Sequence, residues 1–292
     1  MTAVLRQIAE HIGAAAGHPF DTAQGRNLGG GCINTALVLS DAAHSYFVKL
    51  NRAEGLPMFE AEAAGLAELA GTATLRVPEP LCTGVAGGQA FIVMEHLDLG
   101  GRSSGAKAGR LLAAMHRTTS DAFGWGRDNT IGSTPQPNRR DADWARFWAD
   151  QRLGFQLGLA ARSGHGGALQ RQGEALIDRL PALLDHGPVP SLLHGDLWGG
   201  NMAFTRGGEP AIFDPAVYYG DREADLAMTE LFGGFGSDFY AAYREAWPLE
   251  PAYATRRDLY NLYHILNHLN LFGGGYLGQA LGLMGRLLAQ VR

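Results

Sequence analysis

The stretch HGDLWGGN, at residues 194–201, is the most informative part of the chain. The carboxylate of Asp196 is followed five positions later by the amide of Asn201. This spacing is typical of a loop in which the carboxylate takes the proton of an attacking hydroxyl and the amide oxygen holds Mg²⁺. Asp and Asn also cap ordinary turns, so the surrounding sequence has to decide between the two interpretations.

A second carboxylate follows eighteen positions after Asp196, where the apolar run at 211–213 ends at Asp214. Mg²⁺ is a hard cation that prefers oxygen ligands and substrate phosphates. We therefore expect Asp196 to be a catalytic base, and we expect Asn201 and Asp214 to be metal ligands.

Lysine is rare in this chain, with two lysines among the 24 basic residues. Lys49 lies in the middle of an apolar strand predicted at 46–50, where an unpaired charge is costly. Glu62 lies on the face of the next predicted helix that packs against the sheet, and Glu60 is the alternative partner. We expect Lys49 to pair with one of these carboxylates and to bind a phosphate.

A glycine-rich run precedes this lysine, between two predicted strands. It comprises Gly29, Gly30, Gly31, Cys32 and Ile33. Because glycine has no side chain, the backbone N–H groups of such a run can approach phosphates closely. No G-x-x-x-x-G-K-[ST] motif is present, which excludes a P-loop fold. The glycine run, lysine, glutamate, H-x-D-x-x-x-x-N and strand-end Asp instead follow one another in the order typical of kinases.

The two parts of the chain differ in character. Residues 1–94 predict a leading helix at 3–16, then a sheet of about five strands that carries one helix at 56–70. Residues 101–292 are mostly helical, with one predicted helix running through 141–161. The fold class that follows is α+β.

Composition excludes several classes of protein. The chain has 292 residues, 46% of them hydrophobic and 18% charged, which is typical of a folded protein of about two domains. A net charge of -5 gives no basic field for nucleic acid. No apolar run reaches the roughly 18 to 20 residues that span a membrane. Two cysteines without a C-x-x-C pair, and no signal-like N-terminus, predict a cytoplasmic protein.

These motifs together resemble the fructosamine kinases, or ketosamine 3-kinases. The resemblance rests on 194–201, on GGGCI at 29–33, on MEHL at 94–97 and on YYGDREADLA at 218–227, and it extends over nearly the whole chain. It implies the two-lobed protein-kinase-like fold that aminoglycoside and choline phosphotransferases share. It further implies ATP, Mg²⁺ and transfer to the 3-hydroxyl of a ketosamine. The resulting 3-phosphate is unstable and releases the amine, which repairs glycation.

The resemblance also implies where the nucleotide binds. It makes Lys49 the phosphate clamp, and it makes residues 95–100 a hinge between the lobes. Nucleotide contacts are expected from the glycine run, from Lys49 and Glu62, and from Met94, Glu95, His96 and Leu97. Phe213-Asp214-Pro215 lacks the glycine of the D-F-G motif, so the activation-loop switching of protein kinases is not expected.

For the acceptor, we expect contacts from Trp198, Asp196, Tyr219 and His268. The aromatic face of Trp198 suits the C–H groups of a sugar. Whether the ketosamine is a fructosamine, a ribulosamine or an erythrulosamine, free or bound to a protein, stays open.

Other functions compete with that of a ketosamine kinase. An aminoglycoside or choline-like acceptor would use the same fold, although a polycation needs an acidic patch. A binding-only pseudokinase would lack Lys49, Asp196 or Asp214, and all three are present. A serine hydrolase would use G-x-S-x-G at 101–105, but polar residues precede it where a buried strand is needed. His116 is expected to donate to nearby backbone.

Cys32 is predicted to be redox-active. Backbone N–H groups that cradle phosphate would also favour a thiolate there. We expect a monomer that mild oxidation inactivates at Cys32, through a sulfenate or a Cys32-linked dimer.

Overall fold

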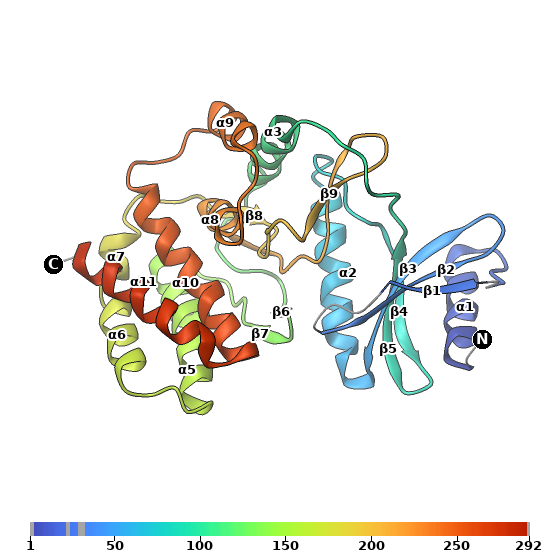
Figure 1. Cartoon of the computed structure of the whole chain (residues 1–292), viewed down its shortest axis with the longest axis horizontal. Coiled ribbons are helices and arrows are strands. Elements are labelled where there is room, and N and C mark those ends of the chain that lie inside the picture. The colour runs from blue at the N-terminus through green and yellow to red at the C-terminus, as the bar shows by residue number, and fades with distance from the viewer. Residues whose placement is uncertain (1–2, 22–23, 29–32, 291–292) are drawn as a thin grey trace. The chain divides into compact units, whose positions relative to one another are not determined.

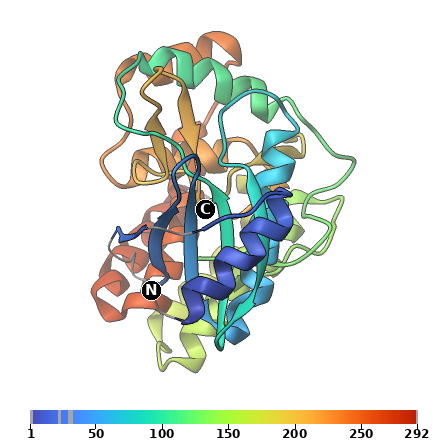
Figure 2. The ribbon, with the colours of Figure 1, turned by 90° about the vertical axis from the view of Figure 1, so that its right-hand side faces the viewer.

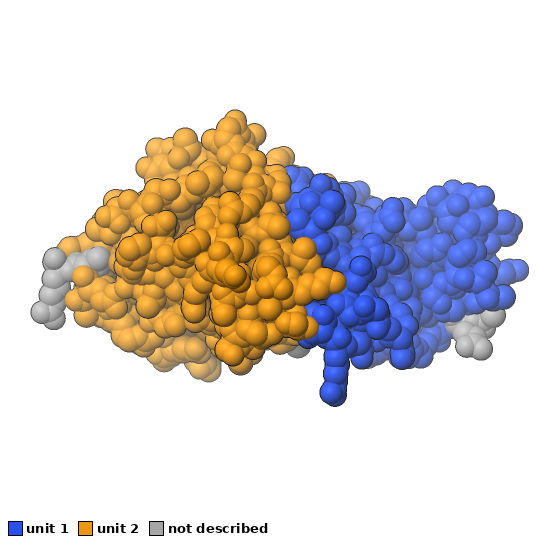
Figure 3. Space-filling view, turned by 90° about the horizontal axis from the view of Figure 1, so that it is seen from above, with its two compact units in different colours: residues 1–103, 203–214 blue, residues 104–202, 215–292 orange. Residues whose placement is uncertain are grey.

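The computed structural model of the chain describes residues 3–21, 24–28 and 33–290. Two compact units make up the chain, and Figure 3 colours them separately. The first unit takes residues 1–103 and 203–214, and the second takes residues 104–202 and 215–292.

Residues 203–214 belong to the first unit, although they lie between two parts of the second unit in the chain. The sequence placed 101–292 in one lobe, whereas 203–214 groups with the first unit. Strands β9 (Met202–Phe204) and β10 (Pro210–Ile212) pair with each other there. The Ile212 N–H donates to the Arg76 carbonyl at 2.9 Å, which ties β10 to the first unit. A backbone bond between residues so distant in the chain leaves no local pattern in the sequence.

An antiparallel sheet of five strands forms the first unit, in the order β1-β2-β3-β5-β4 (Figure 1). The bounds are Gln24–Asn27 for β1, Thr35–Ser40 for β2, Ser45–Arg52 for β3, Pro80–Ala86 for β4 and Gln89–Glu95 for β5. Gly87 and Gly88 join β4 to β5 with φ of 55° and 78°, the left-handed backbone that a tight hairpin turn requires. The predicted sheet of about five strands is thus present.

Two helices, α1 (Ala3–Ala16) and α2 (Leu56–Ala70), cover opposite faces of this sheet (Figures 1 and 2). Both have the bounds predicted from the sequence. Buried residues of α1 share a core with Val48 and Leu50 of β3. Because side chains alternate along a strand, Lys49 between them faces the other way, toward α2. A short 3₁₀ turn, Ala53–Gly55, connects β3 to α2.

The second unit is mostly helical, as predicted. Its helices are α3 (Gly105–His116), α4 (Trp144–Trp148), α5 (Gly154–Arg162), α6 (Ala168–Ile177), α7 (Leu180–Leu183), α8 (Glu223–Leu231), α9 (Ser237–Ala246), α10 (Tyr253–Phe272) and α11 (Leu277–Gln290), and a 3₁₀ turn, Gly274–Tyr276, precedes α11. Where one helix was predicted through 141–161, a π-helical turn at Ala149–Leu153 separates α4 from α5. That turn buries Arg152, whose guanidinium donates to the Pro137 carbonyl at 2.6 Å.

The core of the second unit surrounds α10. Helices α5, α8 and α11 all pack against it. Its side chains Tyr260, Leu262, Ile265 and Leu266 are fully buried, although they point in different directions around the helix. No helix in the described ranges is long and apolar enough to cross a membrane.

Two short strand pairs complete the second unit and position its loops. Strand β6 (Asn129–Ile131) pairs with β7 (Thr134–Gln136), and β8 (Ser191–Leu193) pairs with β11 (Tyr218–Gly220). Strand β8 leads directly into residues 194–201.

Candidate active site

Lys49 and Glu62 form a buried ion pair in the first unit. The Lys49 Nζ lies 2.5 Å from the Glu62 Oε1, and their side chains are only 7% and 10% exposed. Strand β3 directs the lysine toward α2, and α2 presents the glutamate to the sheet. This confirms the pairing that the sequence favoured, whereas Glu60, the alternative, is exposed.

Asp214 contributes a second carboxylate to the same lysine. Its Oδ1 lies 2.5 Å from the Lys49 Nζ, and its side chain is half exposed. The backbone of Asp214 has a φ of 59°, a left-handed conformation that Asp and Asn adopt more readily than most residues. This turn follows β10 and directs the carboxylate to the lysine. The sequence placed Asp214 at a strand end but did not predict this contact.

The two carboxylates determine the charge of Lys49. Burial lowers the pKa of Lys49, but Glu62 and Asp214 outweigh it, so the pKa lies well above its usual value. The ammonium therefore stays charged at all physiological pH. A buried, permanently charged ammonium beside a half-exposed carboxylate is suited to hold a phosphate and its metal ion.

The predicted adenine contacts lie at the end of β5. Met94 is buried, whereas Glu95, His96 and Leu97 are half-buried. The Glu95 carboxylate pairs with Arg76. These positions are compatible with a hinge, and their contact with adenine stays a prediction.

The glycine run is only partly described. Gly29, Gly30, Gly31 and Cys32 lie outside the described residues, so their predicted roles stay predictions. Ile33 is half-buried next to β2. The other cysteine, Cys82, is a free thiol in β4, and burial raises its pKa to about 11. Cys82 is therefore a poor nucleophile at neutral pH.

The loop at 194–201 begins with a turn that only glycine permits. Gly195 has a φ of 83°, and a Cβ there would lie 2.0 Å from the Ala216 carbonyl oxygen. The Ala216 N–H donates to the His194 carbonyl at 2.8 Å. The backbone of 215–217 thus lies directly against the start of the loop.

Asp225 of α8 holds the same two residues from another direction. Its carboxylate accepts the His194 N–H at 2.7 Å and the Gly195 N–H at 2.8 Å. Burial raises the pKa of Asp225, but His116, whose Nε2 lies 3.2 Å away, and these N–H groups outweigh it, so the pKa is lowered. The expectation that His116 donates to nearby backbone was wrong. Its Nε2 contacts Asp225, and its Nδ1 lies 2.8 Å from the Tyr243 hydroxyl.

Asp225 is a functional residue that the sequence analysis did not single out. In the sequence it appears only within the run at 218–227, as a carboxylate between the apolar residues Ala224 and Leu226. Such a carboxylate is costly unless several donors meet it, which predicts buried N–H partners without identifying them.

Asp196 and Asn201 lie together at the two ends of the loop. The Asn201 Nδ2 donates to the Asp196 carbonyl at 2.8 Å and to its Oδ2 at 3.3 Å. Asn201 is buried and Asp196 half-buried. The structure thus brings together the Asp and Asn of the H-x-D-x-x-x-x-N motif. The amide oxygen of Asn201 is a hard donor of the kind that Mg²⁺ prefers, and its predicted role as a metal ligand stays a prediction.

Exposed aromatic rings extend from this loop. Trp198 is 39% exposed, and its ring folds over Gly200. The ring contacts Phe232 at 6.3 Å between centroids, and Phe232 contacts His268 at 5.0 Å. We call these rings, with Phe272 and Tyr276, which contact His268 at 5.4 and 5.2 Å, the aromatic strip.

The aromatic strip links two of the predicted substrate residues, Trp198 and His268. Phe232, Phe272 and Tyr276 were missed, since the sequence gives no sign of which aromatic side chains gather near the surface. Phe232 and Phe272 are exposed, and Tyr276 is half-buried. Tyr219 lies in β11, where its N–H donates to the Gly124 carbonyl at 2.8 Å. Its role in substrate binding stays a prediction.

The G-x-S-x-G motif does not lie on a turn from a buried strand into a helix, because its serine, Ser103, is exposed in a loop. The next residue, Ser104, is the N-cap of α3, and its hydroxyl accepts the Ala106 N–H at 3.1 Å. Asp238 accepts the same N–H at 3.1 Å.

His186, Asp221 and Glu223 are residue types that bind metals, and their ligand atoms lie within 4.8 Å of one another. Hydrogen bonds within the protein already satisfy both carboxylates. Glu223 receives two guanidinium bonds from Arg256, at 2.6 and 2.9 Å. Asp221 accepts from His186 at 2.8 Å and from the Tyr260 hydroxyl at 2.5 Å. The group is a buried structural network.

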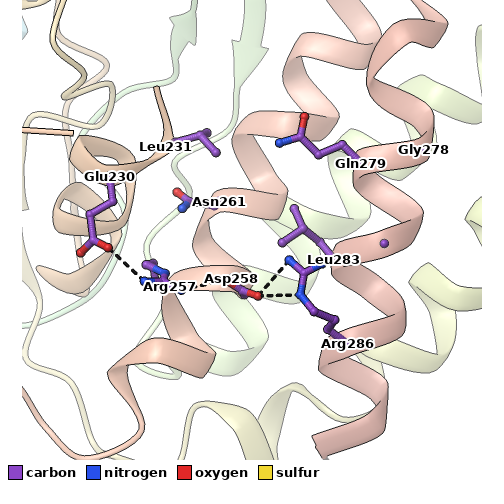
Figure 4. A pocket seen from close by; sticks show the side chains of 10 residues that line it. Glu230, Leu231, Arg257, Asp258, Asn261, Gly278, Gln279, Leu283 and Arg286 are labelled. Carbon is purple, nitrogen blue, oxygen red and sulfur yellow. Dashed lines mark hydrogen bonds and ion pairs between the residues drawn. The ribbon is translucent and has the colours of Figure 1, made fainter. Parts of the chain in front are cut away.

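A pocket of about 400 Å³ lies between α8, α10 and α11, and Figure 4 shows the side chains that line it. Its charged side chains pair with one another, Arg257 with Glu230 and Arg286 with Asp258, both at 3.1 Å. None of its lining residues belongs to the loop at 194–201 or to the aromatic strip. It contributes nothing to the candidate site.

Known proteins resemble this chain along its whole length. The sequence model of the fructosamine kinases matches residues 4–290. The chain belongs to the fructosamine kinase family. A probable ketoamine kinase from Synechocystis is 49% identical, with 96% of each chain covered. The chloroplastic protein-ribulosamine 3-kinase of Arabidopsis thaliana is 46% identical, with 91% of this chain and 83% of that protein covered.

Solved structures agree with this family. A Haemophilus somnus protein assigned as a fructosamine-3-kinase has a TM-score of 0.90 at 29% identity, with 98% of each chain covered. An aminoglycoside phosphotransferase in complex with ADP and hygromycin B has a TM-score of 0.65 at 17% identity, with 100% of this chain and 98% of that chain covered. The second likeness shows the fold alone, which is the kinase-like fold that the sequence predicted.

Proposed function

We propose that this protein is an ATP-dependent kinase that phosphorylates the 3-hydroxyl of ketosamines. The observation that carries the proposal is the loop at 194–201, in which Asp196 and Asn201 meet through hydrogen bonds while Asp225 holds the loop. Membership of the fructosamine kinase family supports the acceptor class. The relatives named above include a ketoamine kinase and a protein-ribulosamine 3-kinase.

Asp196 acts as the general base. Its carboxylate accepts the proton of the sugar hydroxyl as the oxygen attacks the γ-phosphorus of ATP, the bond from that phosphorus to the β–γ bridging oxygen breaks, and ADP leaves. The Asn201 amide, which donates to the Asp196 Oδ2, keeps the carboxylate in one orientation. A fixed orientation matters because phosphoryl transfer depends mainly on positioning and charge.

Lys49 holds the phosphates of ATP. Glu62 keeps the ammonium in place beside the sheet, and the charge of Lys49 is permanent. Asn201 and Asp214 are the donors that we propose for Mg²⁺. When bound, this ion neutralises charge on the phosphates.

The ketosamine sugar packs against Trp198. An exposed indole next to the proposed base offers a flat apolar face to sugar C–H groups. His268 and Phe232 extend this surface away from the loop. An open aromatic surface fits an acceptor that carries its sugar on a larger amine.

The alternatives are weaker on specific grounds. A pseudokinase has no use for a buried Lys49–Glu62 pair that also meets Asp214. An aminoglycoside would need carboxylates to receive its amines, whereas the surface beside the loop is aromatic. Choline would be held by aromatic rings, so it stays in the test.

A four-substrate assay tests the proposal. ATP turnover is measured with ribulose-lysine, fructose-lysine, kanamycin and choline, and products are identified by phosphorus NMR. We expect turnover with a ketosamine, a 3-phosphate product and its later decay to free amine. Turnover with kanamycin or choline alone would contradict the acceptor class, and no turnover with any acceptor would contradict the kinase.

A further inference from the structure

A cluster of buried carboxamides lies at the β6–β7 hairpin (Figure 1). Asn129 and Gln136 face each other across the two strands, and Asn138 follows. These residues are only 9%, 1% and 1% exposed. A buried carboxamide is costly unless its N–H and C=O groups find partners. The partners therefore reveal what the cluster holds in place.

Gln136 holds the backbone that lies against the catalytic loop. Its Nε2 donates to the Ala216 carbonyl at 3.0 Å and to the Asn129 Oδ1 at 2.9 Å. Its Oε1 accepts the Tyr263 hydroxyl at 2.7 Å, which fixes the orientation of the carboxamide. The Asn129 Nδ2 donates to the next carbonyl, that of Val217, at 2.8 Å. Two consecutive peptides are thus held by side chains of one hairpin.

The two backbone groups of Ala216 in turn hold the start of the loop. The N–H donates to the His194 carbonyl at 2.8 Å, and the carbonyl oxygen leaves no room for a Cβ at Gly195. Asp225 holds the N–H groups of the same two residues. Asp196 follows immediately, so these contacts restrict the position of its backbone.

The geometry points to Gln136 as a positioning residue for the catalytic loop. It keeps the Ala216 backbone in place, and this backbone keeps the Gly195 turn from which Asp196 projects. The inference rests on the proposed role of Asp196 as the base. Because Gln136 acts through backbone, its loss changes the rate of phosphoryl transfer while leaving the binding of both substrates unchanged.

Asn138 provides a matched control. It is as buried as Gln136 and has the same functional group. Its Nδ2 donates to the Arg127 carbonyl at 3.2 Å and to the Asn129 Oδ1 at 2.8 Å, and its Oδ1 accepts from Arg152 at 2.7 Å. It shares the Asn129 Oδ1 with Gln136, but its side chain does not bond the Ala216 carbonyl. Removing Asn138 costs stability in the same way without removing the bond to Ala216.

The experiment compares Gln136→Leu with Asn138→Leu and wild type. Circular dichroism and thermal unfolding identify a temperature at which all three are folded, and kcat and both KM values are measured there. We expect Gln136→Leu to lower kcat by about tenfold or more with each KM within about twofold, since a small displacement of a catalytic group is costly to the rate. We expect Asn138→Leu to keep kcat within about threefold while its unfolding temperature falls comparably.

Two outcomes would overturn the inference: a kcat of Gln136→Leu within about twofold of wild type, or an equal loss of kcat in Asn138→Leu. If either leucine variant fails to fold, Gln136→Glu and Asn138→Asp replace the pair under the same two criteria. These substitutions keep the shape of each side chain and replace its amide nitrogen with an oxygen. If wild type uses an acceptor other than a ketosamine, the proposed acceptor class fails, and the variants are compared on the acceptor that it does use.

Discussion

Lys49 and Asp196 lie in contrasting surroundings, and each is suited to a different task. Lys49 is buried and meets two carboxylates, so it stays charged. Asp196 is half-buried and meets the Asn201 amide, which orients its carboxylate. A clamp for phosphate needs permanent charge, whereas a base needs access to the hydroxyl that it deprotonates. Substitution of single side chains therefore separates the two roles.

Asp196→Asn is expected to lower kcat by at least ~10²-fold and to leave the KM for ATP within about twofold, because only the proton acceptor is lost. Steady-state kinetics on a verified ketosamine measure both. Asp121→Asn is the control, since Asp121 is an exposed carboxylate that pairs with Arg140. Retention of more than about a tenth of the wild-type kcat would contradict the role of Asp196.

Trp198→Ala is expected to raise the KM for the ketosamine by about tenfold, with the KM for ATP within about twofold, because an aromatic face that binds one substrate is lost. Phe232→Ala should act in the same direction with a smaller effect, since its ring lies further along the aromatic strip. Val189→Ala, at another exposed apolar residue, is the control. Equal increases in both KM values would indicate a structural tryptophan.

Cys32 is expected to make the enzyme sensitive to peroxide, as its sequence environment predicts. Activity of wild type, Cys32→Ala and Cys82→Ala is measured after mild oxidation, with and without ATP. Wild type should lose activity, regain it with a thiol reductant and be protected by ATP. Cys82→Ala should behave in the same way, because the high pKa of the Cys82 thiol makes it unreactive at neutral pH. Equal sensitivity of Cys32→Ala and wild type would disprove this.

At the scale of elements, the catalytic loop is held by parts distant from it in the chain. Helix α8 supplies Asp225, helix α3 supplies His116 and the β6–β7 hairpin supplies Gln136. Asp225 bonds the loop backbone itself, His116 bonds the Asp225 carboxylate, and Gln136 bonds the Ala216 carbonyl beside the loop. Each contact replaces water that a buried polar group would otherwise need. Loss of one of them leaves buried N–H or C=O groups without a partner, so stability and activity should fall together.

Asp225→Asn is expected to lower the free energy of unfolding by roughly 3 kcal/mol, because an amide N–H would then face the N–H groups of the loop. Urea unfolding at neutral pH measures the change. Asp258→Asn, which removes a partly exposed ion pair with Arg286, should cost less than about 1 kcal/mol. Similar losses in the two variants would show that Asp225 does not hold the loop as described.

At the scale of the whole molecule, buried ionisable groups make stability depend on pH. Burial, with the nearby charge of His268, lowers the pKa of His264 to about 3. The charges of Asp225 and Arg152 act on it with opposite signs. Its Nδ1 is buried and has no hydrogen-bond partner among the described residues, which agrees with a neutral ring. The unfolded chain takes up a proton near the usual pKa of 6.5, whereas the folded chain does not.

The free energy of unfolding is therefore expected to fall as pH drops below 6.5, and to keep falling until the pH nears the pKa of the folded state. The slope from this one group approaches about 1.4 kcal/mol per pH unit. Urea unfolding of wild type and His264→Gln between pH 7 and pH 5 measures it. The variant should show a flatter dependence, and parallel curves would contradict the neutral buried state of His264.

The sequence alone determined the elements whose signals are local. Helices α1 and α2 have the predicted bounds because apolar periodicity and a following glycine act within a few residues. Lys49 and Glu62 could be paired because strand alternation and helix periodicity each direct a side chain to a known face. The spacing of Asp196 and Asn201 likewise describes a contact that one short loop makes by itself.

Tertiary structure alone decided what depends on residues far apart in the chain. The contact of Lys49 with Asp214, the hold of Asp225 on the loop and the place of 203–214 in the first unit all join distant segments. The π-helical turn at Ala149–Leu153 accompanies a buried arginine whose partners lie before α4. Local preferences are similar whether or not such partners are present, so only packing of the folded chain selects them.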